Sequence, residues 1–345
     1  MLQSKTYIAV PPGETIKEQL SIREMPEEKF SEEMEISPQD TKKLLNGSLS
    51  ITSDLAYRLE RVLGIPQSFW EKYEKLYRDT IHLVNLENDG EVLKKFPFRE
   101  MQKLQWIKEG KSKEENVIIM RQFFETDNLL RILEDKSLTI ACRCLKKTDK
   151  TSPAVLAWAQ KARIEARTIR VGQINSQRLR DEITHLRVFS LKKFDEFRPI
   201  LSATLARCGI AIVFLPHLPG AYLPALTFRD GQKIIISLSA RGKDADKFWF
   251  NLFHEIGHIL HGDLDRNGNL TDEEERKADE FSRRTLIPDD KFSEFCNQGL
   301  FASTDIKAFA EKISVQPGVV VGRLQKDGYI PFSELNELKE KYKIF

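Results

Sequence analysis

The sequence predicts a mainly α protein with a small β-sheet (an α+β fold), in which an all-α N-terminal domain precedes a domain built around one buried helix. Three observations support this prediction. Residues 12–80 carry apolar residues at helical spacing, interrupted by Pro and Gly, as in short packed helices. Strand-like runs occur at 210–215, 226–228 and 233–238. The apolar run 248–261 contains two histidines four residues apart, which a helix places on one face.

The composition is that of an ordinary globular protein. The 345 residues are enough for two or three domains, and 41% are hydrophobic and 31% charged. No apolar run approaches the roughly 18 residues that a membrane-spanning helix needs. Residues 1–14 lack the pattern of a secretory signal, so we expect a cytoplasmic protein that does not contact a membrane. The four cysteines form no C-x-x-C pair and are interpreted as reduced thiols: Cys142, Cys144, Cys208 and Cys296.

The net charge of +2 conceals a segregation of charge along the chain. Residues 1–80 carry 11 basic and 14 acidic side chains, whereas residues 141–200 carry 14 basic and 6 acidic ones. The basic segment could meet nucleic acid or an acidic partner, although such a face is more often simply solvated.

The first 80 residues predict four or five short helices. The first spans about 13–25, and Pro26 opens the second. Ser37 is a predicted N-cap with Pro38 at the first helical position of the third, which ends at Asn46-Gly47. A fourth helix is capped by Thr52 or Ser53, and a fifth begins near Pro66. The tight turn before the third helix suggests a helix-turn-helix, whose reading helix would offer DNA four residues: Gln39, Thr41, Lys42 and Lys43.

These helices carry a resemblance to the XRE-like helix-turn-helix domain of HigA-type antitoxins. The resemblance rests on Pro12-Gly13-Glu14, Leu44-Leu45-Asn46-Gly47, Ile51-Thr52, Ala56-Tyr57-Arg58-Leu59, Leu63-Gly64 and Phe69-Trp70. It implies a regulator that represses its own operon and pairs with a ribosome-dependent ribonuclease toxin. Two departures weaken the implied DNA binding: Glu35 stands where the turn usually has Gly, and the preceding helix is acidic. The alternative is a helix-turn-helix kept for protein contact. With a net charge of −3, residues 1–80 would need a homodimer or the basic segment to hold operator DNA.

Residues 81–152 read as a helical connector without evident chemistry, and the polar stretch 146–153 is the expected linker. Residues 153–345 form the second predicted domain. There, 210–215 reads as a buried strand, and the next two strand-like runs read as a β-hairpin. Residues 234–237 are the candidate for an exposed edge strand that pairs with an extended substrate, unless this strand only supports the helix behind it.

The run 248–261 contains the motif H-E-x-x-H, with His254, Glu255 and His258. Two imidazoles on one helix face can share a Zn²⁺ ion at about 2.0–2.1 Å. Glu255 is displaced around the helix, where its carboxylate would accept a proton from the attacking water rather than bind the metal.

A third metal ligand is predicted downstream, in the motif E-x-x-x-D formed by Glu275 and Asp279. Glu275 would complete a His₂Glu zinc site. Asp279, one turn later, would accept the second N–H of a ligand histidine. The alternative for both acids is a solvated helical N-terminus, where acidic residues are favoured.

The same region resembles the ImmA/IrrE family of metallopeptidases. The resemblance is carried by Ile234–Ser239, Phe248-Trp249-Phe250, the H-E-x-x-H helix, Ala278–Phe281 and Leu286-Ile287-Pro288. It implies a gluzincin-like zinc peptidase domain that cleaves one specific regulatory protein, such as a repressor or a partner antitoxin.

Residues 263–274 also satisfy the calcium-loop pattern D-x-D-x-N-G-x₅-E. The alternative is a turn of Asp, Asn and Gly that reverses the chain and returns Glu275 to the zinc.

The sequence therefore predicts an antitoxin-type transcriptional regulator that carries a zinc-dependent endopeptidase domain. The competing hypothesis is a DNA-binding antitoxin that neutralises its toxin by contact and has a structural or regulatory zinc. Intact H-E-x-x-H favours the enzyme, because a structural site does not require Glu255.

Overall fold

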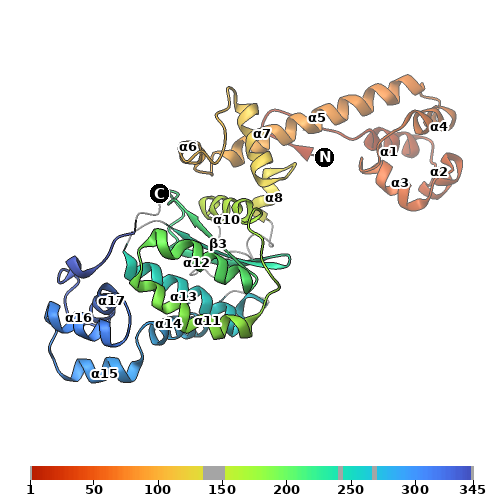
Figure 1. The fold of residues 1–345 in the computed structure, drawn as a ribbon. Helices are drawn as coiled ribbons and strands as arrows, with labels where there is room; N and C mark the ends of the chain where they lie inside the picture. The colour runs from red at the N-terminus through yellow and green to blue at the C-terminus, as the bar shows by residue number, and fades with distance from the viewer. Residues whose placement is uncertain (1, 135–151, 240–243, 266–269, 343–345) are drawn as a thin grey trace. The chain divides into compact units, whose positions relative to one another are not determined.

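The computed structural model describes residues 2–134, 152–239, 244–265 and 270–342, and Figure 1 shows the chain as a ribbon. The chain divides into two compact units. Unit 1 comprises Met1–Lys95 and Gly110–Leu130, and unit 2 comprises Phe96–Glu109 and Arg131–Phe345. The described residues are mostly helical with two small sheets. The predicted α+β class is confirmed, and the two-stranded sheet at the N-terminus was not predicted.

Unit 1 is a helical unit with a short N-terminal ribbon. Its elements are β1 (Leu2–Gln3), β2 (Ile8–Ala9), α1 (Pro12–Ile22), α2 (Glu27–Met34), α3 (Pro38–Leu45), α4 (Ser53–Leu63), α5 (Gln67–Leu93) and α7 (Lys113–Phe124). The four or five helices predicted between residues 12 and 80 are five, α1 to α5. Ser37 caps α3 through its side chain as expected, and of the two candidates for α4 the cap is Thr52. Their apolar faces meet in one core that includes Phe30, Leu44 and Trp70.

The turn between α2 and α3 depends on Glu35. Its φ of 53° lies in the left-handed region that glycine adopts most easily. Arg61 donates a hydrogen bond of 2.9 Å to the Glu35 carboxylate, and Arg58 donates one of 3.2 Å to the Glu35 carbonyl. These contacts from α4 fix the turn, although the residue is not glycine. The hydrogen bond and charge of Arg61 keep the pKa of this exposed carboxyl below its usual value.

The helix α5 is longer than the sequence suggested, since it continues from Gln67 to Leu93 through the domain boundary expected at residue 80. Buried Asp89 near its end accepts a hydrogen bond of 2.7 Å from Arg121 on α7 and one of 2.9 Å from the backbone of Leu129. This buried pair ties part of the predicted connector to unit 1. Two shorter helices, α6 (Phe98–Lys103) and α8 (Leu129–Glu134), follow in the chain. Cys142, Cys144 and most of the expected linker 146–153 lie outside the described residues.

Unit 2 contains a three-stranded sheet of β3 (Ile210–Leu215), β4 (Ala225–Asp230) and β5 (Lys233–Ser239) in the order β3-β5-β4. The predicted hairpin is confirmed, because β4 pairs antiparallel with β5 and Gly231 turns the chain with a φ of 58°. The predicted edge strand is wrong. Residues 234–237 lie in the middle of the sheet, because β3 pairs parallel with β5 on its other side. A run of three isoleucines suits this doubly flanked position.

Helices cover both faces of this sheet. Three of them contact the strands: α10 (Pro153–Ala166), α12 (Phe194–Arg207) and α13 (Ala245–His261). The other helices of this part of unit 2 are α11 (Ser176–Val188), α14 (Asp272–Leu286), α15 (Asp289–Asn297), α16 (Ser303–Lys312) and α17 (Pro317–Lys326). All six residues of β3 are buried, which requires cover on both sides. Figure 1 shows α10 on one side of the strands and α12 and α13 on the other. The described residues contain no helix that is long and apolar enough to cross a membrane.

Candidate metal centre

The centre is built on α13, whose apolar face is fixed in the core of unit 2. Trp249, Leu252 and Phe253 are fully buried, and the indole N–H of Trp249 donates a hydrogen bond of 2.7 Å to the hydroxyl of Tyr342. The helix ends at Gly262, whose φ of 75° lets its backbone N–H donate to the carbonyls of the last turn. A helix anchored in this way presents its remaining face, with the H-E-x-x-H motif, in a fixed orientation.

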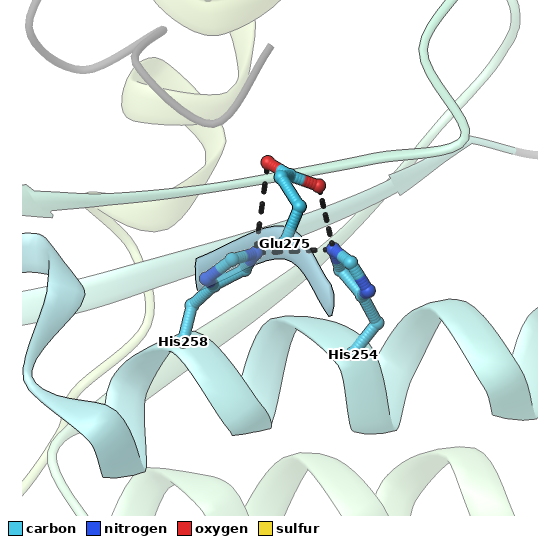
Figure 2. A group of neighbouring side chains, drawn as sticks. All are labelled: His254, His258 and Glu275. Carbon is cyan, nitrogen blue, oxygen red and sulfur yellow. Dashed lines mark hydrogen bonds and ion pairs between the residues drawn. The ribbon is translucent and has the colours of Figure 1, made fainter. Parts of the chain in front are cut away.

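The structure brings the three predicted ligands together. The Nε2 atoms of His254 and His258 lie 3.0 Å apart. Glu275, from α14, places its Oε2 3.6 Å from Nε2 of His254 and its Oε1 4.0 Å from Nε2 of His258. Figure 2 shows the carboxylate above the two imidazoles, with all three side chains pointing at one spot. These donor atoms all lie within 4.8 Å of one another, and they form a candidate metal site.

Close packing of α14 on α13 puts Glu275 in place. A Cβ atom on Gly257 would lie 3.2 Å from the Cα of Ala278, so the glycine lets the two helix backbones approach. At the start of α14, Thr271 and Glu274 form a capping box that sets where the helix begins. The position of the carboxylate is therefore determined by the contact between the helices.

Each histidine also contacts a carboxylate through its other ring nitrogen. Asp279 Oδ1 lies 2.9 Å from Nδ1 of His254, in the position that the sequence spacing had assigned to it. Asp263 Oδ2 lies 2.8 Å from Nδ1 of His258, and both of these side chains are buried. With Nδ1–H donating to a carboxylate, Nε2 of each ring is left as a ligand atom.

The role of Asp263 was not predicted, because this residue was considered only as part of a chain-reversing turn or of a calcium loop. The signal was present: Gly262 ends α13 and turns the chain, which can return the next carboxylate to the last turn of the helix. The first and last residues of this calcium-loop pattern form hydrogen bonds to other protein groups. Asp263 bonds His258, and the Glu274 carboxylate accepts hydrogen bonds from Thr271. Residues 266–269 in its middle lie outside the described residues.

The carboxyl group of Glu255 is buried beside the two histidines but is not a member of the ligand cluster. Burial raises its pKa above the usual value, against the lowering effect of His254 and of a hydrogen bond from Thr227 on β4. Its Oε2 has no hydrogen-bond partner among the described residues. A buried carboxylate with a raised pKa and a free oxygen is suited to accept a proton from a bound polar molecule.

The carboxylates around His254 and its burial act on its pKa in opposite directions. Burial lowers the pKa of this imidazole, but its hydrogen bonds to Asp279 and Glu275 and the charge of Glu255 outweigh that effect and raise the pKa to about 9. The carboxylates thus favour positive charge at this spot, whether it is a proton or a metal ion.

The predicted DNA contacts lie on α3 in unit 1, and one of them is wrong. Gln39, Lys42 and Lys43 are exposed. Thr41 is buried and its hydroxyl lies 2.7 Å from that of Ser31 on α2, so it packs the two helices together and cannot reach DNA. Thr41 lies three and four residues before Leu44 and Leu45, the apolar residues of the same helix, and this spacing places it on the inner face.

The fold and the site together define a helix-based centre with two histidines and a glutamate as candidate metal ligands. Residues 206–325, about a third of the chain, match the family model of the IrrE N-terminal-like domain (Peptidase_M78). The matched segment contains all three candidate ligands. It also contains Glu255, Asp263 and Asp279. Peptidases of this family are metal-dependent, so the match supports a metallopeptidase domain in this part of the chain. No curated protein and no solved structure matches the chain. The resemblance of unit 1 to HigA-type antitoxins remains a prediction.

Proposed function

We propose that unit 2 is a zinc-dependent endopeptidase domain that cleaves a specific regulatory protein. The observation that supports this most directly is Glu255: its buried carboxyl, with one oxygen lacking a partner among the described residues, lies beside the cluster of His254, His258 and Glu275. A centre that only holds a metal for stability has no use for a fourth, non-ligating carboxylate at this point.

The distances suit zinc. Four ligands at about 2.0–2.1 Å in tetrahedral geometry place donor atoms about 3.3 Å from each other. The three donor separations here are 3.0, 3.6 and 4.0 Å, which straddle this value. Three protein ligands leave the fourth position for water or substrate, as in catalytic zinc sites.

In the proposed reaction, Glu255 moves the protons. A zinc ion held by the cluster would lower the pKa of bound water towards 7 and polarise the scissile carbonyl. The Glu255 carboxylate takes the proton from the attacking water and later gives it to the leaving amine nitrogen. Asp279 and Asp263 act as positioning residues, because they hold the two imidazoles in the orientation that presents Nε2.

The substrate strand is assigned to β4 rather than to β5. Within the described sheet β4 pairs on one side only, and its Thr227 lies next to Glu255. An extended peptide added along β4 would bring its carbonyl groups past the centre. This strand takes over the role that we expected for residues 234–237.

The experiment that tests this function replaces Glu255 by Gln in the full chain. Glutamine is nearly isosteric and leaves the three ligands intact, but it cannot accept a proton at neutral pH. Cleavage of a co-expressed neighbouring-gene product, followed by gel and mass spectrometry, should fall by at least about 10²–10⁴-fold. Glu273→Gln, an exposed change on α14, is the matched control and should cleave normally.

We also propose that unit 1 binds operator DNA and a cognate toxin. The support is local: α2, the left-handed turn at Glu35 and α3 have the order of a helix-turn-helix, and Gln39 and Lys42 are exposed on α3. Binding of the full-length protein to its own promoter should weaken steeply with salt, because phosphate contacts release counterions. No footprint at low salt would favour a helix-turn-helix used for protein contact.

The competing function is a contact antitoxin whose zinc is structural. Glu255→Gln separates the two in one strain, because neutralisation by contact does not depend on a proton acceptor. Loss of partner cleavage with retained toxin neutralisation supports two separate activities. Unchanged partner levels in the variant would leave only the binding protein.

A further inference from the structure

A cavity lies in unit 2 beside the metal centre. Its volume is about 400 Å³, and its walls come from α13, the end of α14, α17 and residues 332–339. None of the candidate metal ligands lines it. The size falls in the range of small-molecule sites, about 300–1,000 Å³.

The charged side chains that line this cavity are mostly basic. The basic ones are Lys247, Arg283, Arg323, Lys326 and Lys339, and the acidic ones are Asp244 and Asp246. Lys339 Nζ lies 3.0 Å from Asp246 Oδ2, and Lys247 Nζ lies 3.0 Å from Asp244 Oδ2. The other three basic side chains also lie near carboxylates, which are outside the lining. Arg283 and Arg323 lie 3.8 and 3.4 Å from Asp289, and Lys326 lies 3.8 Å from Asp279. The choice of ligand therefore depends on individual unpaired donor atoms rather than on the net charge of the cavity.

Three polar atoms of the lining residues are buried without a hydrogen-bond partner in the described part of the chain. They are Nη1 of Arg323, Nε of Arg283 and Oδ1 of Asp246. Buried polar atoms are almost always paired, and each orphan costs free energy. Two orphaned donors and one orphaned acceptor around one cavity indicate that something else satisfies them.

Arg323 is held rigidly for such a role. Its side chain is only 9% exposed, and its guanidinium lies 4.4 Å from the ring centroid of Phe292. Its other nitrogens donate hydrogen bonds to Asp327 at 2.5 Å and to Asp289 at 3.4 Å. These contacts fix the guanidinium of Arg323, so the side chain loses little conformational entropy when an acceptor binds to Nη1.

The rest of the wall is apolar. Phe250, Leu286, Val319 and Phe332 all line the cavity. A ligand that fits must therefore have an apolar body as well as polar ends, because a small inorganic anion would leave these side chains uncovered.

We propose that this cavity binds a small organic anion, with its carboxylate or phosphate at Arg283 and Arg323, its apolar body against Phe250 and Leu286, and a donor group towards Asp246. This proposal goes beyond the proposed peptidase, since it concerns a separate site and binding alone. The cavity shares a wall with the metal centre. Lys326 lies 4.1 Å from the Phe250 ring and 3.8 Å from Asp279 Oδ2, and Phe250 lies one turn before His254.

The test measures binding to the full-length, zinc-loaded protein by isothermal titration and ligand-observed NMR. The probes are 4-hydroxybenzoate, its neutral analogue 4-hydroxybenzyl alcohol, and phenyl phosphate. We expect both anions to bind at least tenfold more tightly than the alcohol, because a charged partner for a buried guanidinium contributes more than a neutral one. The order of the two anions then shows whether the site prefers a carboxylate or a phosphate.

Variants of two neighbouring arginines test whether the anion binds in this cavity or at the zinc. Arg283→Gln should lower the affinity for the preferred anion about tenfold, and Arg283→Lys should restore part of it. Arg284→Gln is the matched control, because Arg284 also bonds Asp289 but does not line the cavity. Both variants should take up zinc normally. Equal binding of acid and alcohol, or equal losses in Arg283→Gln and Arg284→Gln, would overturn the proposal. Binding that disappears when zinc is removed would also overturn it and would place the anion on the metal.

Discussion

Removing the charge of Asp263 should weaken metal binding more than the same change at Asp279. Both carboxylates contact a candidate ligand histidine, at 2.8 and 2.9 Å. They differ in solvent access, since the Asp263 side chain is 3% exposed and that of Asp279 is 49% exposed. Partners of this kind typically contribute about 10–100-fold to metal affinity. Because water screens an exposed charge, we expect Asp263→Asn near the upper end of this range and Asp279→Asn near the lower end.

The affinity is measured by competition with a chromophoric zinc chelator at fixed pH and ionic strength. Asparagine can still accept the N–H of His258, so the ring keeps its orientation and only the charge changes. Asp290→Asn, at a surface carboxylate away from the centre, is the control. A melting curve of each metal-free variant shows whether the fold survives. Equal losses at Asp263 and Asp279, or a larger loss at Asp279, would refute the idea that burial decides the contribution.

Three further changes probe the same centre. Glu275→Ala should remove most of the zinc from the purified protein, as measured by elemental analysis, and full occupancy would show that the third ligand lies elsewhere. Zinc affinity should rise about tenfold per pH unit between pH 6 and 8, because metal binding expels the proton of His254, whose pKa of about 9 lies above that range. In the metal-free protein, by contrast, the stability of the fold should fall as the pH rises. A pKa raised from 6.5 stabilises the fold fully below pH 6.5, and this stability is lost as the pH rises through 9, which thermal unfolding at several pH values can check. Gly257→Ala should weaken zinc binding, because the new methyl group would lie 3.2 Å from the Cα of Ala278 and push α14 outwards; unchanged affinity would mean that the helices can move apart without cost.

The helices could be predicted from the sequence because their signals are local. Ser37 and Thr52 cap through their own side chains, and Pro and Gly mark the ends. The ligand cluster could be predicted because its two histidines and Glu275 occur in motifs with fixed spacing. The order of strands could not, since the hairpin shows that β4 and β5 pair but not which of them also pairs with β3.

The misplaced residues share a cause. Thr41 was expected to contact DNA and Asp263 to lie in a turn or a calcium loop. Each is buried instead, and its side chain pairs with Ser31 on α2 or with His258 on α13. Composition favours the exposed interpretation of such residues, and it outweighed the local signals, which were the helical spacing of Thr41 and the helix end at Gly262 before Asp263. Glu35 shows the converse: the predicted turn forms there without the usual glycine, and two arginines from α4 hold the unfavourable backbone conformation.

The carboxylates that orient the two histidines come from opposite ends of the following segment, and this sets an order of assembly during synthesis. His254 and His258 are made first, but their ring orientations depend on Asp279 and Asp263, and the third ligand depends on α14. Residues 245–261 alone would therefore hold a metal only through two freely turning rings. The full set of candidate ligands and orienting carboxylates therefore exists only after residue 279 has been made and α14 has packed on α13. Metal uptake then reports that this part of the domain has folded.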